Sequence, residues 1–263
     1  MIRSQKPLLL FLVAVLAVSC TDNIKNDKNY SLEKNSSNSS SEVQLKDSIK
    51  VAFLIYPEMA VLDMTGPMDA FIKINRMTEN QYEVYTVSAS TAIIKTQGHI
   101  IETKADYTFE NAPKPDILIV PGAKIDIVLA LADKPNYAKY IKEQSKNAEV
   151  TMSVCTGSFA LGKLGLLNGK KATTHWILGD KFEKDFNSTK LVRDVRYVQD
   201  ENIITTSGVA TGIDGALAII SEYSGPNFAG MASRALQYET KIKEPWPAMS
   251  TKPMKHGDSE PRD

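Results

Sequence analysis

The chain has 263 residues, of which 43% are hydrophobic, and its 31 Lys and Arg are balanced by 31 Asp and Glu. This composition excludes a wholly disordered chain and a nucleic-acid-binding polycation, so we expect no nucleic-acid partner. The length predicts one domain, or at most two small ones. The sequence has two cysteines, Cys20 and Cys155, and three scattered histidines. These counts exclude a disulfide scaffold and a Cys- or His-rich metal site, and we expect neither a metal ion nor a cofactor.

Residues 1–19 have the features of a bacterial export signal. A short basic segment precedes an apolar run over residues 7–18 that is too short to span a membrane comfortably. The run ends in Ala17-Val18-Ser19-Cys20, which resembles a lipobox, in which a signal peptidase cuts before the cysteine and lipid is attached to its sulfur. We therefore expect a lipoprotein of the bacterial cell envelope, periplasmic or on the outer surface, anchored through Cys20. A plain secretory signal or an uncleaved anchor is the alternative.

Two polar segments flank the predicted domain. Residues 20–48 are rich in Asn, Ser, Lys and Asp, and they contain too little apolar surface to offset the entropy lost on ordering. We expect them to form a flexible tether. Residues 246–263 carry three prolines and many charges, which predicts a disordered tail. The folded domain is thus expected over residues 49–245.

The predicted domain alternates short apolar runs with helical stretches. The runs are continuous, as in strands that are covered on both faces: Val51–Tyr56, Tyr85–Val87, Ile117–Val120, Val150–Val154 and Ile203–Thr206. The helical stretches are Pro67–Ile74, Ile125–Leu131, Asn136–Lys146, Gly157–Leu167 and Ile213–Tyr223. This alternation predicts an α/β sandwich with a mostly parallel sheet and right-handed crossovers. Residues 91–103 are expected to form an antiparallel hairpin beside that sheet.

Chemically informative residues follow four of the predicted strands. Asp63 comes soon after the first strand, Gly122 after the third, Cys155 after the fourth and Gly208 after the fifth. Ligands of such folds bind outside the carboxyl ends of the strands. We therefore expect a carboxylate, a thiol and two glycine turns to meet at one edge of the sheet.

Cys155 is the most specific of these signals. In Ser153-Val154-Cys155-Thr156-Gly157 it lies on a predicted strand-to-helix turn, where a nucleophile stands exposed at the top of a sheet. The start of the following helix favours the thiolate. The alternative is a buried, inert cysteine, which is common in proteins.

Five other residues are candidates for the same site. A partly buried Asp63 facing Cys155 would have a raised pKa and act as a proton donor, but it is as readily a helix cap or turn residue. Gly122 and Ala123 are candidates for binding a developing anion through their N–H groups, together with Thr156, although an ordinary turn explains them equally. His175 is a further pocket candidate, but a lone histidine is more often a packing residue than a base.

The motifs together resemble the ThiJ/PfpI family of the class I glutamine amidotransferase-like superfamily, and within it the isonitrile hydratases and the ligand-binding-like domains of certain AraC-type regulators. The matching stretches span the whole predicted domain: Val51–Pro57, Leu62–Pro67, Val120–Gly122, Ser153–Ser158, Ala172–Trp176 and Thr206–Asp214. The resemblance implies a flavodoxin-like three-layer sandwich, often a homodimer, with Cys155 as nucleophile and Asp63 as its carboxyl partner.

Three positions depart from the family pattern. Thr156 stands where the protease- and deglycase-like branch usually has histidine, which argues against a Cys–His protease. Ala123 replaces the second glycine of the usual Pro-Gly-Gly, and Glu58 stands where glycine is common, at the expected mouth of the pocket.

For a small-molecule isonitrile, the resemblance implies hydration to an N-substituted formamide. Asp63 would protonate the terminal carbon, and Cys155, or a water that it orients, would add to that carbon with help from Thr156. One alternative is another thiol-dependent hydrolase, such as an amidase, or a glyoxal-handling enzyme. Another is a non-enzymatic sensor or binding module in which Cys155 is oxidised instead of turned over.

Overall fold

The structure is a computed structural model that describes residues 48–239. Its centre is a seven-stranded sheet in the order β10-β11-β7-β6-β1-β2-β5, in which every neighbouring pair is parallel except β10 and β11. In chain order the strands are β1 (Ile49–Leu54), β2 (Tyr82–Ser88), β5 (Tyr107–Thr108), β6 (Ile117–Val120), β7 (Val150–Val154), β10 (Tyr197–Asp200) and β11 (Ile203–Thr206).

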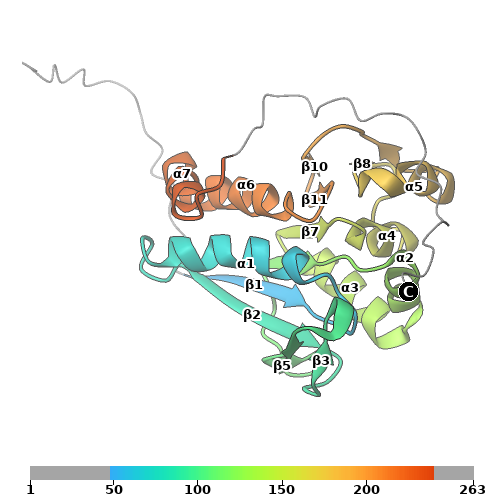
Figure 1. Cartoon of the computed structure of the whole chain (residues 1–263), viewed down its shortest axis with the longest axis horizontal. Coiled ribbons are helices and arrows are strands. Elements are labelled where there is room, and N and C mark those ends of the chain that lie inside the picture. Colours follow the sequence, from blue (N-terminus) through green and yellow to red (C-terminus); the bar gives the residue numbers. More distant parts are fainter. Residues whose placement is uncertain (1–47, 240–263) are drawn as a thin grey trace, which may run out of the picture. The chain divides into compact units, whose positions relative to one another are not determined.

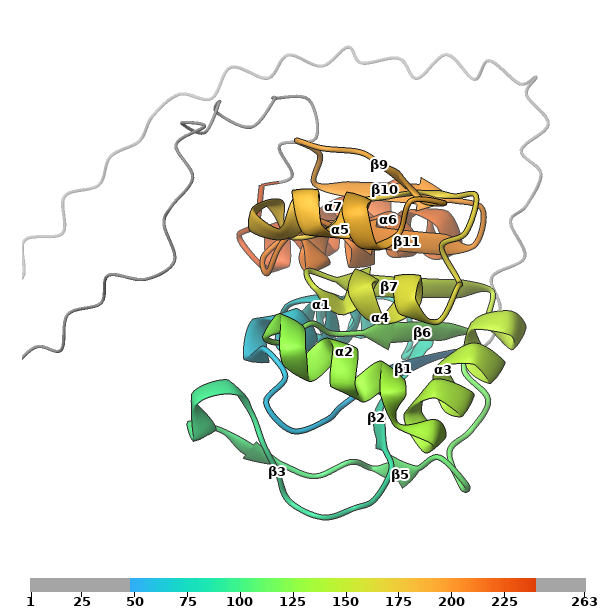
Figure 2. The same cartoon turned by 90° about the vertical axis from the view of Figure 1, so that its right-hand side faces the viewer.

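Helices cover both faces of the sheet (Figures 1 and 2). On one face, α1 (Val61–Asn75), α6 (Gly212–Ser224) and α7 (Pro226–Ala235) pack against one another. On the other, α2 (Ile125–Asp133) packs against both α3 (Pro135–Asn147) and α4 (Gly157–Lys163). The predicted α/β fold, a flavodoxin-like three-layer sandwich with a mostly parallel central sheet, is therefore confirmed.

The buried strands explain why the sequence pattern was informative. All residues of β6 and β7 are buried, because both strands lie inside the sheet with a helical layer on each side. Their bounds agree with the predicted runs. Two smaller sheets lie outside the main one, and they pair β3 (Ile94–Lys95) with β4 (Glu102–Thr103) and β8 (Lys171–Ala172) with β9 (Lys190–Leu191).

The pair β3 and β4 is the predicted hairpin, and the short helix η1 (Gln97–His99) lies in its turn. Between β8 and β9 the chain forms η2 (Trp176–Leu178) and α5 (Gly179–Asp185). Of this segment, Thr174, just after β8, contacts the Cys155 carbonyl.

Two predicted helix bounds were wrong. Helix α1 begins at Val61 instead of Pro67, so Asp63 lies in its first turn and the proline lies inside the helix. The burial of Met64 and Phe71 on one helix face outweighs the backbone hydrogen bond that a proline removes. Helix α4 ends at Lys163 instead of Leu167, because Gly165 adopts a left-handed φ of 78° just beyond it.

The predicted signal peptide, the tether except for Ser48, and the tail lie outside the described residues, as does the lipidation site Cys20. Within residues 48–239, no helix is both long enough and apolar enough to cross a membrane.

Candidate functional site

Cys155 lies at the predicted strand-to-helix turn, between β7 and α4. Its φ of 55° is in the left-handed region, which is unfavourable for a residue with a side chain. The surrounding structure holds it there: its N–H donates to Thr206 O at 3.1 Å, and its carbonyl accepts from Ser158 Oγ at 3.1 Å and Thr174 Oγ1 at 3.4 Å. Hydrogen bonds on both sides of Cys155 therefore fix its backbone.

Two glycines allow the chain to approach this turn closely. A Cβ on Gly157 would collide with the carbonyl oxygen of Val120 in the neighbouring strand. A Cβ on Gly122 would collide with the Thr156 hydroxyl and would lie 2.8 Å from Asp63 Oδ2. The Gly122 turn is thus in direct contact with both the carboxyl and the hydroxyl of the candidate site.

Asp63 is fully buried, and its carboxyl group faces the loop after β6. Its Oδ2 accepts the Gly122 N–H at 2.9 Å, whereas Oδ1 is buried with no hydrogen-bond partner among the described residues. It does not cap α1, whose N-cap residue is Ala60. Burial raises the pKa of Asp63 to about 7, although the Gly122 hydrogen bond partly opposes this rise. Near neutral pH the carboxyl therefore exchanges a proton readily.

The Cys155 thiol is 7% exposed. Burial, and then the nearby charge of Asp63, raise its pKa to about 12, while the adjacent Thr156, chiefly through its N–H, lowers it. The N–H of Thr156 at the start of α4 does lower the pKa of the thiol, as expected, but burial outweighs this effect and the resting thiol is protonated.

Thr156 and Ala123 form a reciprocal pair. The Thr156 hydroxyl donates to Ala123 O at 2.6 Å and accepts from the Ala123 N–H at 3.0 Å. Because the Gly122 N–H is bonded to Asp63, neither of the two N–H groups that we expected to bind an anion is free for one. The loop instead fixes the two polar side chains beside the thiol.

His175 stands apart from this cluster. No described hydrogen bond or ion pair joins it to Cys155, Asp63 or Thr156, and its ring stacks on Trp176, which is half exposed. Burial lowers the pKa of His175, so the ring is neutral at physiological pH. The neighbouring Thr174, through its hydroxyl, is the residue of this segment that contacts the Cys155 turn.

Sequence reasoning missed Tyr56, which is fully buried. Its hydroxyl donates to Pro121 O at 2.7 Å, just before Gly122. Burial, and then the charges of Asp63 and Cys155, raise the pKa of Tyr56 well above its ordinary value. Tyr56 therefore lies close to both groups and stays neutral. The only sequence signal was its position at the end of the first apolar run.

Glu58, the residue expected at the pocket mouth, has a left-handed φ of 65° and forms an ion pair with His99 of η1. Its N–H donates to Lys95 O at 2.9 Å, which ties this loop to the hairpin.

Within residues 48–239, no three His, Cys, Asp or Glu side chains are grouped so that they could hold a metal ion.

The chain is similar in sequence to known proteins of more than one kind. The chain is 33% identical over 193 residues to an isonitrile hydratase of Pseudomonas putida, covering 73% of this chain and 79% of that protein. It is 25% identical over 182 residues to the HTH-type transcriptional regulator CdhR of Pseudomonas aeruginosa, covering 69% of this chain but 52% of the regulator.

Solved structures show the same fold. A ThiJ/PfpI family protein from Pseudomonas syringae has a TM-score of 0.66 and 27% identity, covering 81% of this chain and 86% of that one. Drosophila melanogaster DJ-1beta has a TM-score of 0.64 at 18% identity, covering 73% of this chain and all of that one. The model of the DJ-1/PfpI family matches residues 49–222. The chain therefore belongs to the DJ-1/PfpI family.

Proposed function

We propose that this chain is a thiol-dependent hydratase that converts a small isonitrile to an N-substituted formamide. The observation that carries the proposal is the buried, unpartnered Oδ1 of Asp63, on a carboxyl with a pKa of about 7, near a buried thiol. The similarity to the Pseudomonas putida isonitrile hydratase supports the substrate class.

The first step moves one proton. Above pH 7 the Asp63–Cys155 pair holds a single proton, which resides on the sulfur. The raised pKa of Asp63 makes it a better base than an ordinary carboxylate, so its Oδ1 takes the thiol proton and passes it to the terminal carbon of the isonitrile. The sulfur then bonds to that carbon and gives a thioimidate, R–N=CH–S–Cys155, with every atom of isonitrile and thiol retained.

The second step consumes water. Addition of water across the C=N bond gives R–NH–CH(OH)–S–Cys155, and breaking the C–S bond releases R–NH–CHO and returns the proton to the Asp63–Cys155 pair. Thr156 stabilises the negative sulfur in both steps through its N–H. A variant of this route, in which Cys155 orients a water that adds directly, gives the same product.

Turnover of an alkyl isonitrile tests the proposal, with formamide detected by NMR. Cys155→Ala and Asp63→Asn are each expected to lose at least about a hundredfold in kcat. Asp69→Asn is a matched control, because Asp69 lies on the same helix in an exposed pair with Lys73. Absence of formamide, or full turnover in both site variants, would overturn the proposal.

The two alternative functions give different products. Another hydrolase or a glyoxal-handling enzyme of this family would turn over amides, esters or 2-oxoaldehydes and leave isonitriles untouched. A sensor would accumulate a stable Cys155 sulfinate without turnover. The protonated state of the resting thiol argues against a sensor function, because peroxides oxidise thiolates and react slowly with protonated thiols.

We also propose that the protein is anchored in the bacterial envelope through lipid on Cys20, as the lipobox-like sequence suggests. Detergent-phase partitioning of the full chain would test this, and Cys20→Ser is expected to move it to the aqueous phase. Partitioning that does not change in Cys20→Ser would contradict the anchor.

Homodimer formation is a further part of the proposal. Leu62 and Ile72 are each 43% exposed on one side of α1, and they line an apolar groove with Ile213 and Leu236. Burying this groove against a second copy would remove apolar surface from water. Light scattering is expected to give twice the chain mass, and Ile72→Glu to reduce it to the monomer; a monomeric wild type would exclude the dimer.

A further inference from the structure

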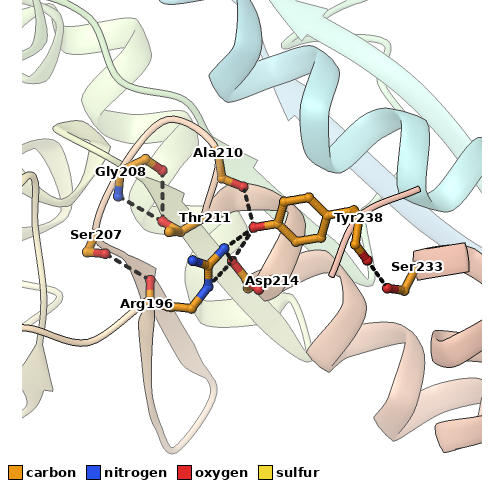
Figure 3. A network of polar contacts seen from close by, with 8 residues as sticks. All are labelled: Arg196, Ser207, Gly208, Ala210, Thr211, Asp214, Ser233 and Tyr238. Carbon is orange, nitrogen blue, oxygen red and sulfur yellow. Dashed lines mark hydrogen bonds and ion pairs between the residues drawn. The ribbon is translucent and has the colours of Figure 1, made fainter. Parts of the chain in front are cut away.

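A polar network joins three segments near the end of the described chain (Figure 3). Arg196 precedes β10, Asp214 lies in the first turn of α6, and Tyr238 follows α7. Arg196 and Tyr238 both bind Asp214 Oδ2. This oxygen accepts hydrogen bonds from Arg196 Nε and from the Tyr238 hydroxyl, each at 2.8 Å. It also forms an ion pair with Arg196 Nη2 at 2.5 Å. The Asp214 side chain is fully buried, so these bonds are shielded from water.

The Tyr238 hydroxyl is the link between the last segment and the rest of the network. It donates its single proton toward Asp214 Oδ2, accepts from Arg196 Nη2, and lies 3.3 Å from Ala210 O. The guanidinium carbon of Arg196 lies 5.6 Å from the centre of the Tyr238 ring. Ser233 Oγ donates to the carbonyl of Tyr238 and holds its backbone. The segment after α7 is therefore attached to the segment before α6.

The same network encloses the loop of residues 207–211. At its start, the N–H and hydroxyl of Ser207 donate to the carbonyl of Arg196 at 2.9 and 3.1 Å. Within it, the Gly208 N–H donates to Thr211 Oγ1, and that hydroxyl is also 2.8 Å from Gly208 O. Figure 3 shows Tyr238 reaching the far side of this loop at Ala210. The loop is thus held at its start, in its middle and at its end.

Both ends of the loop border the candidate site. Thr206, just before it, accepts the N–H of Cys155. Gly212, just after it, packs tightly: a Cβ there would lie 3.0 Å from Val154 and 3.3 Å from Pro67. The start of α6 therefore packs between Val154, the last residue of β7 before Cys155, and the helix that carries Asp63. A shift of this turn would press on both elements.

We infer that Tyr238 is a positioning residue for the Cys155–Asp63 pair, acting through Asp214 and the start of α6. Its hydroxyl is the group that hydrogen-bonds the chain beyond α7 to Asp214 in the first turn of α6. It has no role in contact with substrate. The inference rests on the proposal that Cys155 and Asp63 react together, but the mechanical link can be measured without an isonitrile.

The test compares the rate at which iodoacetamide alkylates Cys155 in the full-length wild type and in variants of Tyr238. Peptide mass spectrometry distinguishes alkylation of Cys155 from that of Cys20. Tyr238→Phe keeps the ring against Arg196 but removes the hydroxyl. We expect alkylation about fivefold faster, as loss of one hydrogen bond from a local opening equilibrium predicts. The matched control is Tyr223→Phe on α6, which loses a hydroxyl bond to Glu149 away from the site, and whose rate is expected to stay at the wild-type value.

A second control separates positioning from general loss of stability. Ile141→Val removes a methyl group from the fully buried face of α3, on the opposite side of the sheet. If Ile141→Val accelerates the alkylation of Cys155 as much as Tyr238→Phe does, the inference is wrong. It is also wrong if the alkylation rates of Tyr238→Phe and Tyr223→Phe are the same. Should Tyr238→Phe fail to fold, Ser233→Ala, which loosens the same segment, is expected to give a smaller acceleration.

The isonitrile assay adds a distinct result. If the wild type hydrates isonitriles, Tyr238→Phe is expected to lower kcat about fivefold with little change in KM, because the substrate still binds. If the wild type does not hydrate isonitriles but alkylation changes as expected, the proposed function fails and the positioning role stands. If KM rises and kcat and the alkylation rate are unchanged, the positioning role fails.

Discussion

Gly122 donates its N–H to Asp63 Oδ2 at 2.9 Å, and its lack of a side chain is what permits that approach. One bond thus joins the loop after β6 to the first turn of α1. It fixes one carboxyl oxygen, while the other has no hydrogen-bond partner among residues 48–239. The chemistry proposed for the site depends on this asymmetry between the two oxygens of one carboxyl group.

Gly122→Ala tests the contact directly. The added methyl group would press against Asp63 and the Thr156 hydroxyl, so we expect a loss of about 2 kcal/mol in the free energy of unfolding and a large loss of turnover. Urea unfolding and the formamide assay measure the two effects. Gly208→Ala is the control, since a Cβ at Gly208 meets nothing within 4 Å. Equal behaviour of the two variants would contradict the close contact.

The stability of the protein should reveal the titration of Asp63. Its pKa rises from 3.8 to about 7 on folding, so the folded state binds more protons and loses stability as pH rises between these values. Asp63→Asn removes this dependence. The difference in unfolding free energy, variant minus wild type, is therefore expected to grow by about 1.4 kcal/mol per pH unit from pH 4 to 7. A difference that stays constant over this range would contradict the raised pKa.

The pH dependence of turnover follows from the number of protons that the Asp63–Cys155 pair holds. Because the reactive pair carries one proton, kcat/KM is expected to rise as pH increases through about 7 and then to remain level up to the highest pH at which the protein is stable. Stopped assays from pH 5 to 10 would show this. A profile that falls through pH 7 would mean that the doubly protonated pair reacts.

Thr156 is expected to serve both stability and catalysis. Thr156→Val leaves the N–H and carbonyl of Ala123 without their partner, at an expected cost of about 2 kcal/mol. Because the Thr156 hydroxyl holds the loop after β6 beside the thiol, turnover should fall by at least about tenfold. Thr156→Ser keeps the hydroxyl and is expected to retain most of the stability and most of the turnover. Equal unfolding free energies and equal turnover in Thr156→Ser and Thr156→Val would show that the hydroxyl has no role.

Much of the fold could be predicted because its strands are buried on both faces. The runs at β6, β7 and β11 are continuous and end at glycine- or cysteine-containing turns, so even their bounds were predicted correctly. The antiparallel edge strand β10 and helix α7 were not predicted. Half-buried β10 has no continuous apolar run, and α7 follows α6 after the single residue Gly225.

The site could be predicted only in outline. Chain order and the position after each strand indicated that Asp63, Gly122 and Cys155 would meet. The contacts of Ser158 and Thr174 with the Cys155 carbonyl, and the nearness of Tyr56, depend on how separate segments pack. The protonation of the thiol depends on burial in the folded state, which a helix-start pattern does not report.

The most direct test of the account is a rapid-quench experiment with an alkyl isonitrile, in which the mass of the Cys155 peptide is measured during turnover. We expect the mass of the Cys155 peptide to increase transiently by one isonitrile in the wild type. In Asp63→Asn, the adduct is expected to form at least about a hundredfold more slowly. Formamide production with Cys155 unmodified throughout, and undiminished in Cys155→Ala, would contradict the account.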